Sequence, residues 1–163
     1  MMKILVLSDS HGAVAPMVRA IRQVQPDEVI HLGDCVPDAL ALGQRFPALP
    51  LHIVVGNNDQ NASAPDRLLL TVGGVAVLAV HGHQYGVYNG PLRLSLAARE
   101  LGVDVALYGH THQAACTRTD SGLWLLNPGA CGAIYPTCGV LEIANGGVTC
   151  YNAKVDPAPA GQE

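Results

Sequence analysis

Short apolar runs alternate along the chain with polar segments rich in glycine and proline, which indicates strands and helices in succession. The first apolar run, residues 3–7, is continuous, as expected of a strand buried on both faces. Over residues 13–25 the apolar positions recur every three or four residues, which predicts a helix. Further strands at 29–32 and 51–55, with a short helix at 38–46 between them, favour parallel strands joined by crossover helices.

The second half of the chain reads as hairpins around one helix. A helix is predicted at residues 91–101 and a buried strand at 103–108, after a polar loop at 61–66. Glycine-containing turns join the other predicted strands into three hairpins: 67–72 with 75–80, 116–119 with 123–126, and 140–143 with 148–151. Ten strands exceed what one sheet of this size holds comfortably. The predicted fold class is therefore α/β, with two mixed β-sheets packed face to face and helices outside.

Composition sets the class of protein. The 163 residues suffice for one domain, which we place at residues 1–152, followed by a flexible tail at 153–163 rich in alanine and proline. With 49% hydrophobic and 13% charged residues, the chain is not of the disordered class. No apolar run approaches the roughly 18 residues of a membrane span, and the first one is shorter than a signal-peptide core of about 7–15 residues. We expect a cytoplasmic protein with no membrane partner.

The net charge restricts the classes of binding partner, and the cysteine pattern indicates the redox state of the thiols. The net charge is −4, and the nine Lys and Arg residues are scattered singly, so a nucleic acid polymer is not an expected partner. Five cysteines without a Cys-x-x-Cys pair are typical of reduced thiols. The high apolar content is compatible with a homo-oligomer.

Polar residues that could carry chemistry follow five of the predicted strands. Each group is flanked by glycine or follows its strand directly, and together they comprise Asp9, His11, Asp34, Asn57, Asn58, His81, His83, His110 and His112. Singly, such residues are more often helix caps, turns or core histidines. Their coincidence at strand ends instead predicts one shared site, because ligands bind outside the carboxyl ends of strands in open α/β sheets. The other two histidines, His31 and His52, lie inside predicted strands and are interpreted as structural.

The residue types indicate metal chemistry. Carboxylates, imidazoles and a carboxamide suit divalent first-row metals such as Mn, Fe, Co, Ni or Zn. Cys35 is the one cysteine in these loops, and we interpret it as a packing residue, which argues against a zinc–thiolate site. Seven candidate ligands are too many for one tetrahedral ion but suit two ions that share a carboxylate. Asp34 is the natural bridge.

As a set, these motifs resemble the calcineurin-like metallophosphoesterases, and the small YfcE-type phosphodiesterases in particular. The resemblance rests on Asp9-Ser10-His11, Gly33-Asp34, Gly56-Asn57-Asn58-Asp59, His81-Gly82-His83, Gly109-His110-Thr111-His112 and Asn127-Pro128-Gly129. It implies a four-layer sandwich in which helices flank the two sheets. It also implies two ligand sets that share Asp34: Asp9, His11, Asp34 and His112 for one ion, and Asp34, Asn57, His81 and His110 for the other.

The implied reaction is hydrolysis of a small phosphodiester by a hydroxide that bridges two divalent ions, with manganese favoured over nickel, cobalt, iron or zinc. Many relatives carry a histidine where this chain has Asn58, which donates a hydrogen bond but is no general acid. We therefore expect a preference for leaving groups that need little protonation. His83 either contacts the substrate or supports a ligand. The alternatives are a phosphomonoesterase or pyrophosphatase of the same fold, and a non-catalytic scaffold like the retromer subunit.

Overall fold

The structure is a computed structural model that describes residues 1–60 and 62–160. Residue 61 of the predicted polar loop and residues 161–163 of the predicted tail lie outside the described residues. The described part of the chain contains ten strands, three α-helices and two short 3-10 helices, which are joined by loops.

The first sheet has the order β10-β9-β1-β2-β3. Strands β1, β2 and β3 are parallel, β9 is antiparallel to its neighbour β1, and β10 is antiparallel to β9. The strands span Met2–Leu7 (β1), Glu28–His31 (β2), Leu51–Ile53 (β3), Thr137–Ala144 (β9) and Gly147–Lys154 (β10).

The second sheet has the order β4-β5-β6-β8-β7, with parallel strands β5, β6 and β8 between two antiparallel edge strands. The strands span Arg67–Val72 (β4), Val75–Val80 (β5), Val105–Leu107 (β6), Ala115–Arg118 (β7) and Trp124–Asn127 (β8). The parallel strands β1, β5 and β6 carry near-continuous buried apolar runs, which is typical of strands with layers on both faces.

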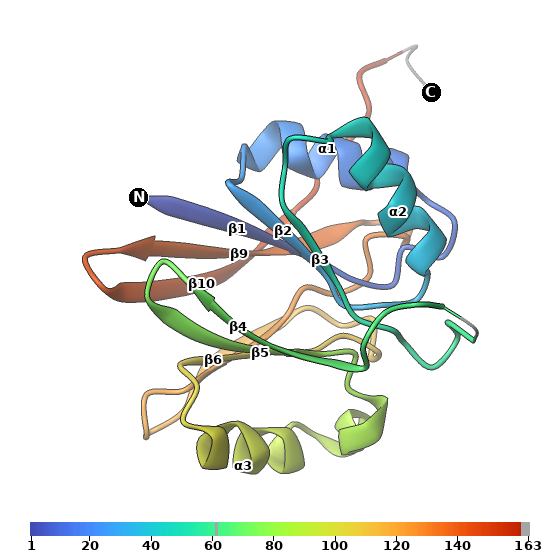
Figure 1. Ribbon diagram of the computed structural model, residues 1–163. Helices are drawn as coiled ribbons and strands as arrows, with labels where there is room; N and C mark the ends of the chain where they lie inside the picture. Colours follow the sequence, from blue (N-terminus) through green and yellow to red (C-terminus); the bar gives the residue numbers. More distant parts are fainter. Residues whose placement is uncertain (61, 161–163) are drawn as a thin grey trace.

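The two sheets pack face to face, with helices on the outside (Figure 1). Helices α1 (Ala15–Val24) and α2 (Val36–Arg45) cover the first sheet, and α3 (Leu92–Leu101) covers the second. Three apolar clusters fill the spaces between the layers: one between the sheets, one under α1 and α2, and one under α3. This arrangement confirms the predicted α/β fold of two mixed sheets flanked by helices.

Most predicted elements differ from the observed ones only at their ends. Helix α1 begins at Ala15, after Val14, so Asp9 and His11 are not its caps. The 3-10 helices η1 (His83–Tyr85) and η2 (Val87–Asn89) had no counterpart in the prediction, because a single short turn leaves no periodic signal. All five cysteines are free thiols, as expected.

The last hairpin is longer than the sequence pattern predicts. Strand β10 continues past Tyr151 and pairs residue by residue with β9 as far as Lys154. Val155 is buried, and its N–H donates to the Pro136 carbonyl. Gln23 of α1 then bonds the backbone on either side of Val155, at Lys154 and Asp156. Residues 153–156 therefore belong to the folded body and not to a flexible tail, since pairing along the hairpin and the bonds to Gln23 outweigh their weak local pattern.

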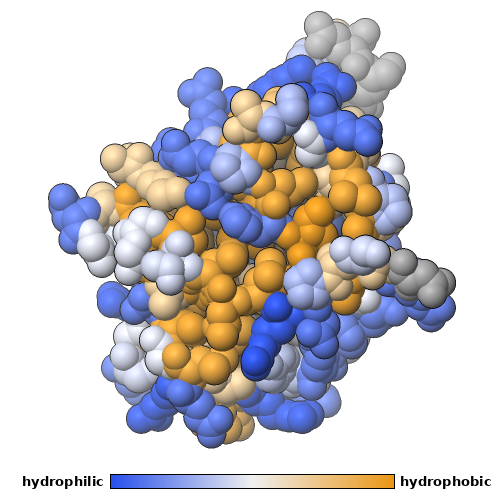
Figure 2. Space-filling view, in the orientation of Figure 1, coloured by the Kyte–Doolittle hydropathy of each residue, from blue (hydrophilic) through white to orange (hydrophobic). Residues whose placement is uncertain are grey.

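One face of the molecule carries a band of apolar residues through its middle (Figure 2). Part of this band follows the edge strand β4, where the Leu69 side chain is about half exposed. Such an edge is compatible with the homo-oligomer, which stays a prediction. Among the described helices, none has the length and apolar character that crossing a bilayer requires.

His31 of β2 is fully buried, and two hydrogen bonds fix its protonation state. Its Nδ1 accepts from the Gly33 N–H at 3.1 Å, which leaves Nε2 to donate to the Ser10 hydroxyl at 3.1 Å. Burial lowers the pKa of His31 to about 4, and the neutral ring ties the ends of β1 and β2 together. This supports its interpretation as a structural histidine.

We predict that His31 makes the fold sensitive to mild acid. Between pH 6.5 and about 4, the unfolded chain binds a proton at His31 that the folded chain does not, so stability falls as the pH is lowered through this range. The expected contribution is about 3 kcal/mol. Urea unfolding of the chelator-treated protein from pH 7 to 4.5 measures it, and His31→Asn, which keeps an acceptor for Gly33, should flatten the dependence. An unchanged slope in that variant would contradict the assignment.

Candidate metal centre

The five polar loops converge at one end of the two sheets. They follow β1, β2 and β3 of the first sheet and β5 and β6 of the second, in each of which the strands run parallel. Within these loops, contacts join six of the seven predicted ligands: Asp9, His11, Asp34, His81, His110 and His112.

Asp9 lies at the centre of the cluster and is completely buried. Its Oδ2 accepts hydrogen bonds from the Ser8 hydroxyl at 2.7 Å and from the His110 backbone N–H at 3.1 Å. These two bonds fix the carboxylate and turn its other oxygen, Oδ1, toward the histidines.

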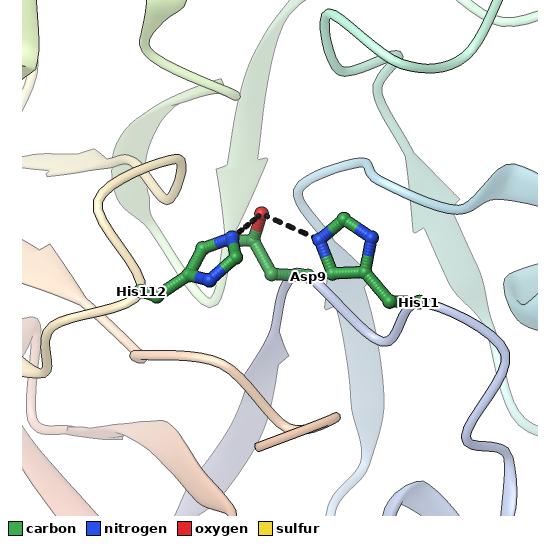
Figure 3. A group of neighbouring side chains, drawn as sticks. All are labelled: Asp9, His11 and His112. Carbon is green, nitrogen blue, oxygen red and sulfur yellow. Dashed lines mark ion pairs between the residues drawn. The ribbon is translucent and has the colours of Figure 1, made fainter.

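Asp9 Oδ1 has no hydrogen-bond donor among the described residues, although it is buried. Three imidazole Nε2 atoms face it, at 3.2 Å for His112, 3.7 Å for His11 and 3.9 Å for His81. Figure 3 shows His11 and His112 on either side of this carboxylate. An unsatisfied buried carboxylate oxygen is costly, and several lone-pair donors aimed at one point are the arrangement that a bound cation satisfies.

Asp34 places a second carboxylate against the same histidines. Its Oδ2 lies 3.5 Å from His81 Nε2 and 3.9 Å from His11 Nε2. Burial alone would raise the pKa of the Asp34 carboxyl, but two hydrogen bonds from Asn58 and the nearby His81 outweigh burial and lower this pKa. Asp34 is therefore ionised, as a metal ligand must be.

A backbone carbonyl fixes the orientation of the His81 imidazole. Its Nδ1 donates to the Leu32 carbonyl at 2.8 Å, which leaves the Nε2 lone pair directed into the site. His110 Nδ1 lies 3.2 Å from this Nε2. Burial, together with the neighbouring His81 and His83, lowers the pKa of His110 and favours its neutral, ligating form.

Two overlapping groups have the spacing of a metal site. One comprises Asp9, His11 and His112, and the other comprises Asp9, Asp34 and His81. The carboxylate and imidazole donors, and the Asp9 Oδ1 atom that lacks a hydrogen-bond donor, fit divalent metal ions. Asp9 is common to the two groups, whereas the sequence suggested Asp34 as the bridge, so that bridging role stays a prediction.

The backbone of the ligand loops is held in an unfavourable conformation. Seven described non-glycine residues have positive φ, and five of them are predicted ligands: Asp9, His11, Asp34, His110 and His112, at φ between 43° and 72°. This left-handed region costs free energy for residues with a side chain, and such residues concentrate at functional sites. The fold therefore maintains these five positions against their local preference.

The remaining predicted site residues lie at the rim. Asn57 is exposed in the same turn as Asn58, and the Asn58 amide donates to Asp34 Oδ2 at 2.8 Å. His83 is exposed, with its ring centroid 5.6 Å from that of His81. Burial, and then His81, lower the pKa of His83. Ligation by Asn57 and substrate contacts by Asn58 and His83 stay predictions.

Asp59 supports the site without belonging to the predicted set. Its Oδ2 accepts from the N–H groups of Asp34 at 2.7 Å and Gly56 at 2.8 Å, and its Oδ1 accepts from Val36 at 2.8 Å. One carboxylate thus joins the loop after β2 to the loop after β3. The Gly56-Asn57-Asn58-Asp59 motif contained this residue, but only the hydrogen bonds give its role.

Asn127 supports the loop that carries His110 and His112. Its buried amide donates to the Gly109 carbonyl at 3.1 Å and to the Thr111 hydroxyl at 2.9 Å. At Gly109, a Cβ atom would overlap the Ser8 hydroxyl and crowd Asp9 Oδ2, so glycine is required there. Through the two hydrogen bonds of Asn127, the Asn127-Pro128-Gly129 motif has a structural role in this loop.

We predict that Asp59 governs both stability and metal binding. Asp59→Ala leaves three backbone N–H groups without an acceptor and should destabilise the fold by about 2–5 kcal/mol. Asp59→Asn keeps one acceptor oxygen and should cost less. In either variant metal affinity, measured by calorimetry, should fall roughly 10–100-fold. The exposed Asp120→Asn is the matched control, and wild-type metal affinity in Asp59→Asn would contradict the role.

Comparisons with known proteins agree with this geometry. The sequence model of the calcineurin-like phosphoesterase superfamily domain matches residues 2–146. The probable metallophosphoesterase YsnB of Bacillus subtilis is 36% identical over 132 residues, which cover 79% of this chain and 75% of YsnB.

Two solved structures share the fold. A structure described as a novel archaeal phosphodiesterase has a TM-score of 0.69 and 25% identity, and the match covers 93% of this chain and 100% of that one. Vps29 of Entamoeba histolytica, complexed with Zn²⁺, has a TM-score of 0.74 and 22% identity, with 95% and 100% covered. At that identity, Vps29 shows the fold alone.

Motif order, fold and the family match lead to one conclusion: this chain belongs to the calcineurin-like phosphoesterase superfamily, and the match supports a metal-dependent phosphoesterase.

Proposed function

We propose that this protein hydrolyses small phosphodiesters with the help of two divalent metal ions. The observation that carries the proposal is the buried Asp9 Oδ1, which lacks a hydrogen-bond donor and faces three imidazole Nε2 atoms. The similarity to an archaeal phosphodiesterase supports the choice of a diester as substrate.

The charges of the site explain why metal is needed. Asp9 and Asp34 place two negative charges where a phosphate must approach, so the protein alone repels its substrate. Asp9, His11, Asp34 and His112 would hold one ion, and Asp34, Asn57, His81 and His110 the other, with manganese the favoured metal. Bound ions would polarise the phosphoryl oxygens and acidify the attacking water.

The chain's own groups orient the reactants. The Leu32 carbonyl and the Asp59 carboxylate hold His81 and Asp34 in place, so little reorganisation is needed when a substrate binds. Asn58 has one amide N–H committed to Asp34, and the second N–H of the same amide is left to donate to a phosphoryl oxygen.

Metal restoration after chelation tests the proposal. The chelated protein should be inert, and Mn, Ni, Co, Zn or Mg, added singly, should restore cleavage of bis-p-nitrophenyl phosphate in preference to p-nitrophenyl phosphate. Asp9→Asn should lower the restored rate by more than roughly 10–100-fold, which is the loss expected when a residue that hydrogen-bonds a metal ligand is substituted. His52→Asn is the matched control, because His52 contacts Glu28 on β2, away from the cluster.

The other outcomes separate the alternatives. Preference for the monoester would indicate a phosphomonoesterase. Stoichiometric metal binding without turnover of either ester would favour a scaffold, and full activity after chelation would refute metal dependence.

Asn58 predicts how the rate depends on the leaving group. Without a general acid at this position, the rate should fall steeply as the pKa of the leaving alcohol rises. Asn58→His should flatten that dependence by offering a proton donor. A series of substituted phenyl methyl phosphates measures the slope, and a flat dependence in the unmodified protein would count against the absence of acid catalysis.

A further inference from the structure

A hollow of about 350 Å³ lies beside the candidate metal centre. It opens between the 3-10 helix η2 and the segment that follows His110, and the residues lining it include Tyr88, Pro91, Tyr108, Thr111 and Gln113. Its volume is at the lower end of the range for small-molecule sites, roughly 300–1,000 Å³.

Tyr88 connects this hollow to the metal centre. Its ring centroid lies 4.3 Å from that of His110, and its hydroxyl donates to the His110 carbonyl at 3.2 Å. The Tyr88 side chain is nevertheless 69% exposed. Two contacts thus fix the ring against a candidate ligand, while most of its surface is free to meet a bound molecule.

Thr111 forms part of the opposite side. It stands between His110 and His112 in sequence, and its hydroxyl accepts from the buried Asn127 amide at 2.9 Å. The loop that holds two candidate ligands therefore also lines the hollow. A group attached to a phosphorus atom at the metal centre would reach the hollow by passing over His110.

We propose that the hollow binds the ester group that stays on the phosphate, and that Tyr88 selects an aromatic or heteroaromatic group there. This rests on the proposed phosphodiesterase function. A tilted or offset aromatic contact with Tyr88 would supply the preference, and the exposed side chain of Gln113 would offer a polar contact. The substrate class is then a diester with at least one aromatic substituent.

Two substrates with the same leaving group test this selection. Methyl p-nitrophenyl phosphate and bis-p-nitrophenyl phosphate both release p-nitrophenol, so they differ in the group that stays. Tyr88→Leu should lower kcat/KM for the aryl diester, relative to the methyl diester, by about 3–10-fold. Tyr88→Phe keeps the ring and should keep the wild-type ratio. Tyr151→Leu, on β10, is the matched control.

Equal losses on both diesters in Tyr88→Leu would overturn the proposal and show that Tyr88 only positions His110. Binding provides a readout that needs no turnover: calorimetry of the metal-loaded protein should show weaker binding of phenyl phosphate, but not of methyl phosphate, in Tyr88→Leu. If the unmodified protein cleaves neither diester, the proposed function fails. Calorimetry still decides whether the hollow prefers an aromatic group. Equal binding of phenyl phosphate and methyl phosphate by the unmodified protein would refute that preference.

Discussion

The site depends on one buried carboxylate. Asp9 has one oxygen satisfied by a hydroxyl and a backbone N–H, and the other faces three imidazole nitrogens with no donor of its own. A protein interior does not favour such an atom unless a cation compensates it. Each neighbouring feature, from the ionised Asp34 to the orientation of His81, makes the same point more attractive to a cation.

The surrounding loops must hold this carboxylate and the histidines in place. Five ligand positions adopt left-handed backbone conformations, which isolated loops would abandon. Asp59 and Asn127 each bond several backbone or side-chain groups in these loops. His31, neutral because it is buried, ties the ends of the first two strands together. The stability of the sandwich thus maintains the geometry of the site, and the rim residues Asn58, His83 and Tyr88 are left exposed toward a substrate.

Much of this could be predicted from local pattern. Continuous apolar runs gave the buried parallel strands, and glycine turns gave the hairpins. Asp, Asn and His at strand ends indicated a shared site, because parallel strands bring their carboxyl ends to one edge. The short helices η1 and η2 were missed because a single turn leaves little trace in local sequence. The last residues of β10 were missed because the bonds from Gln23 of α1, a segment distant in sequence, help to hold this end.

By itself, the sequence determined the layered α/β fold and the residue types of the site, because periodicity and ligand chemistry are properties of the chain alone. Only the tertiary structure decided that Asp9 is the carboxylate with a bare oxygen and that Asp59 joins two loops. It also set Tyr88 against His110 beside a hollow. These features depend on which atoms of distant segments approach within hydrogen-bonding distance. Such distances follow from how the two sheets pack, and no local pattern contains them.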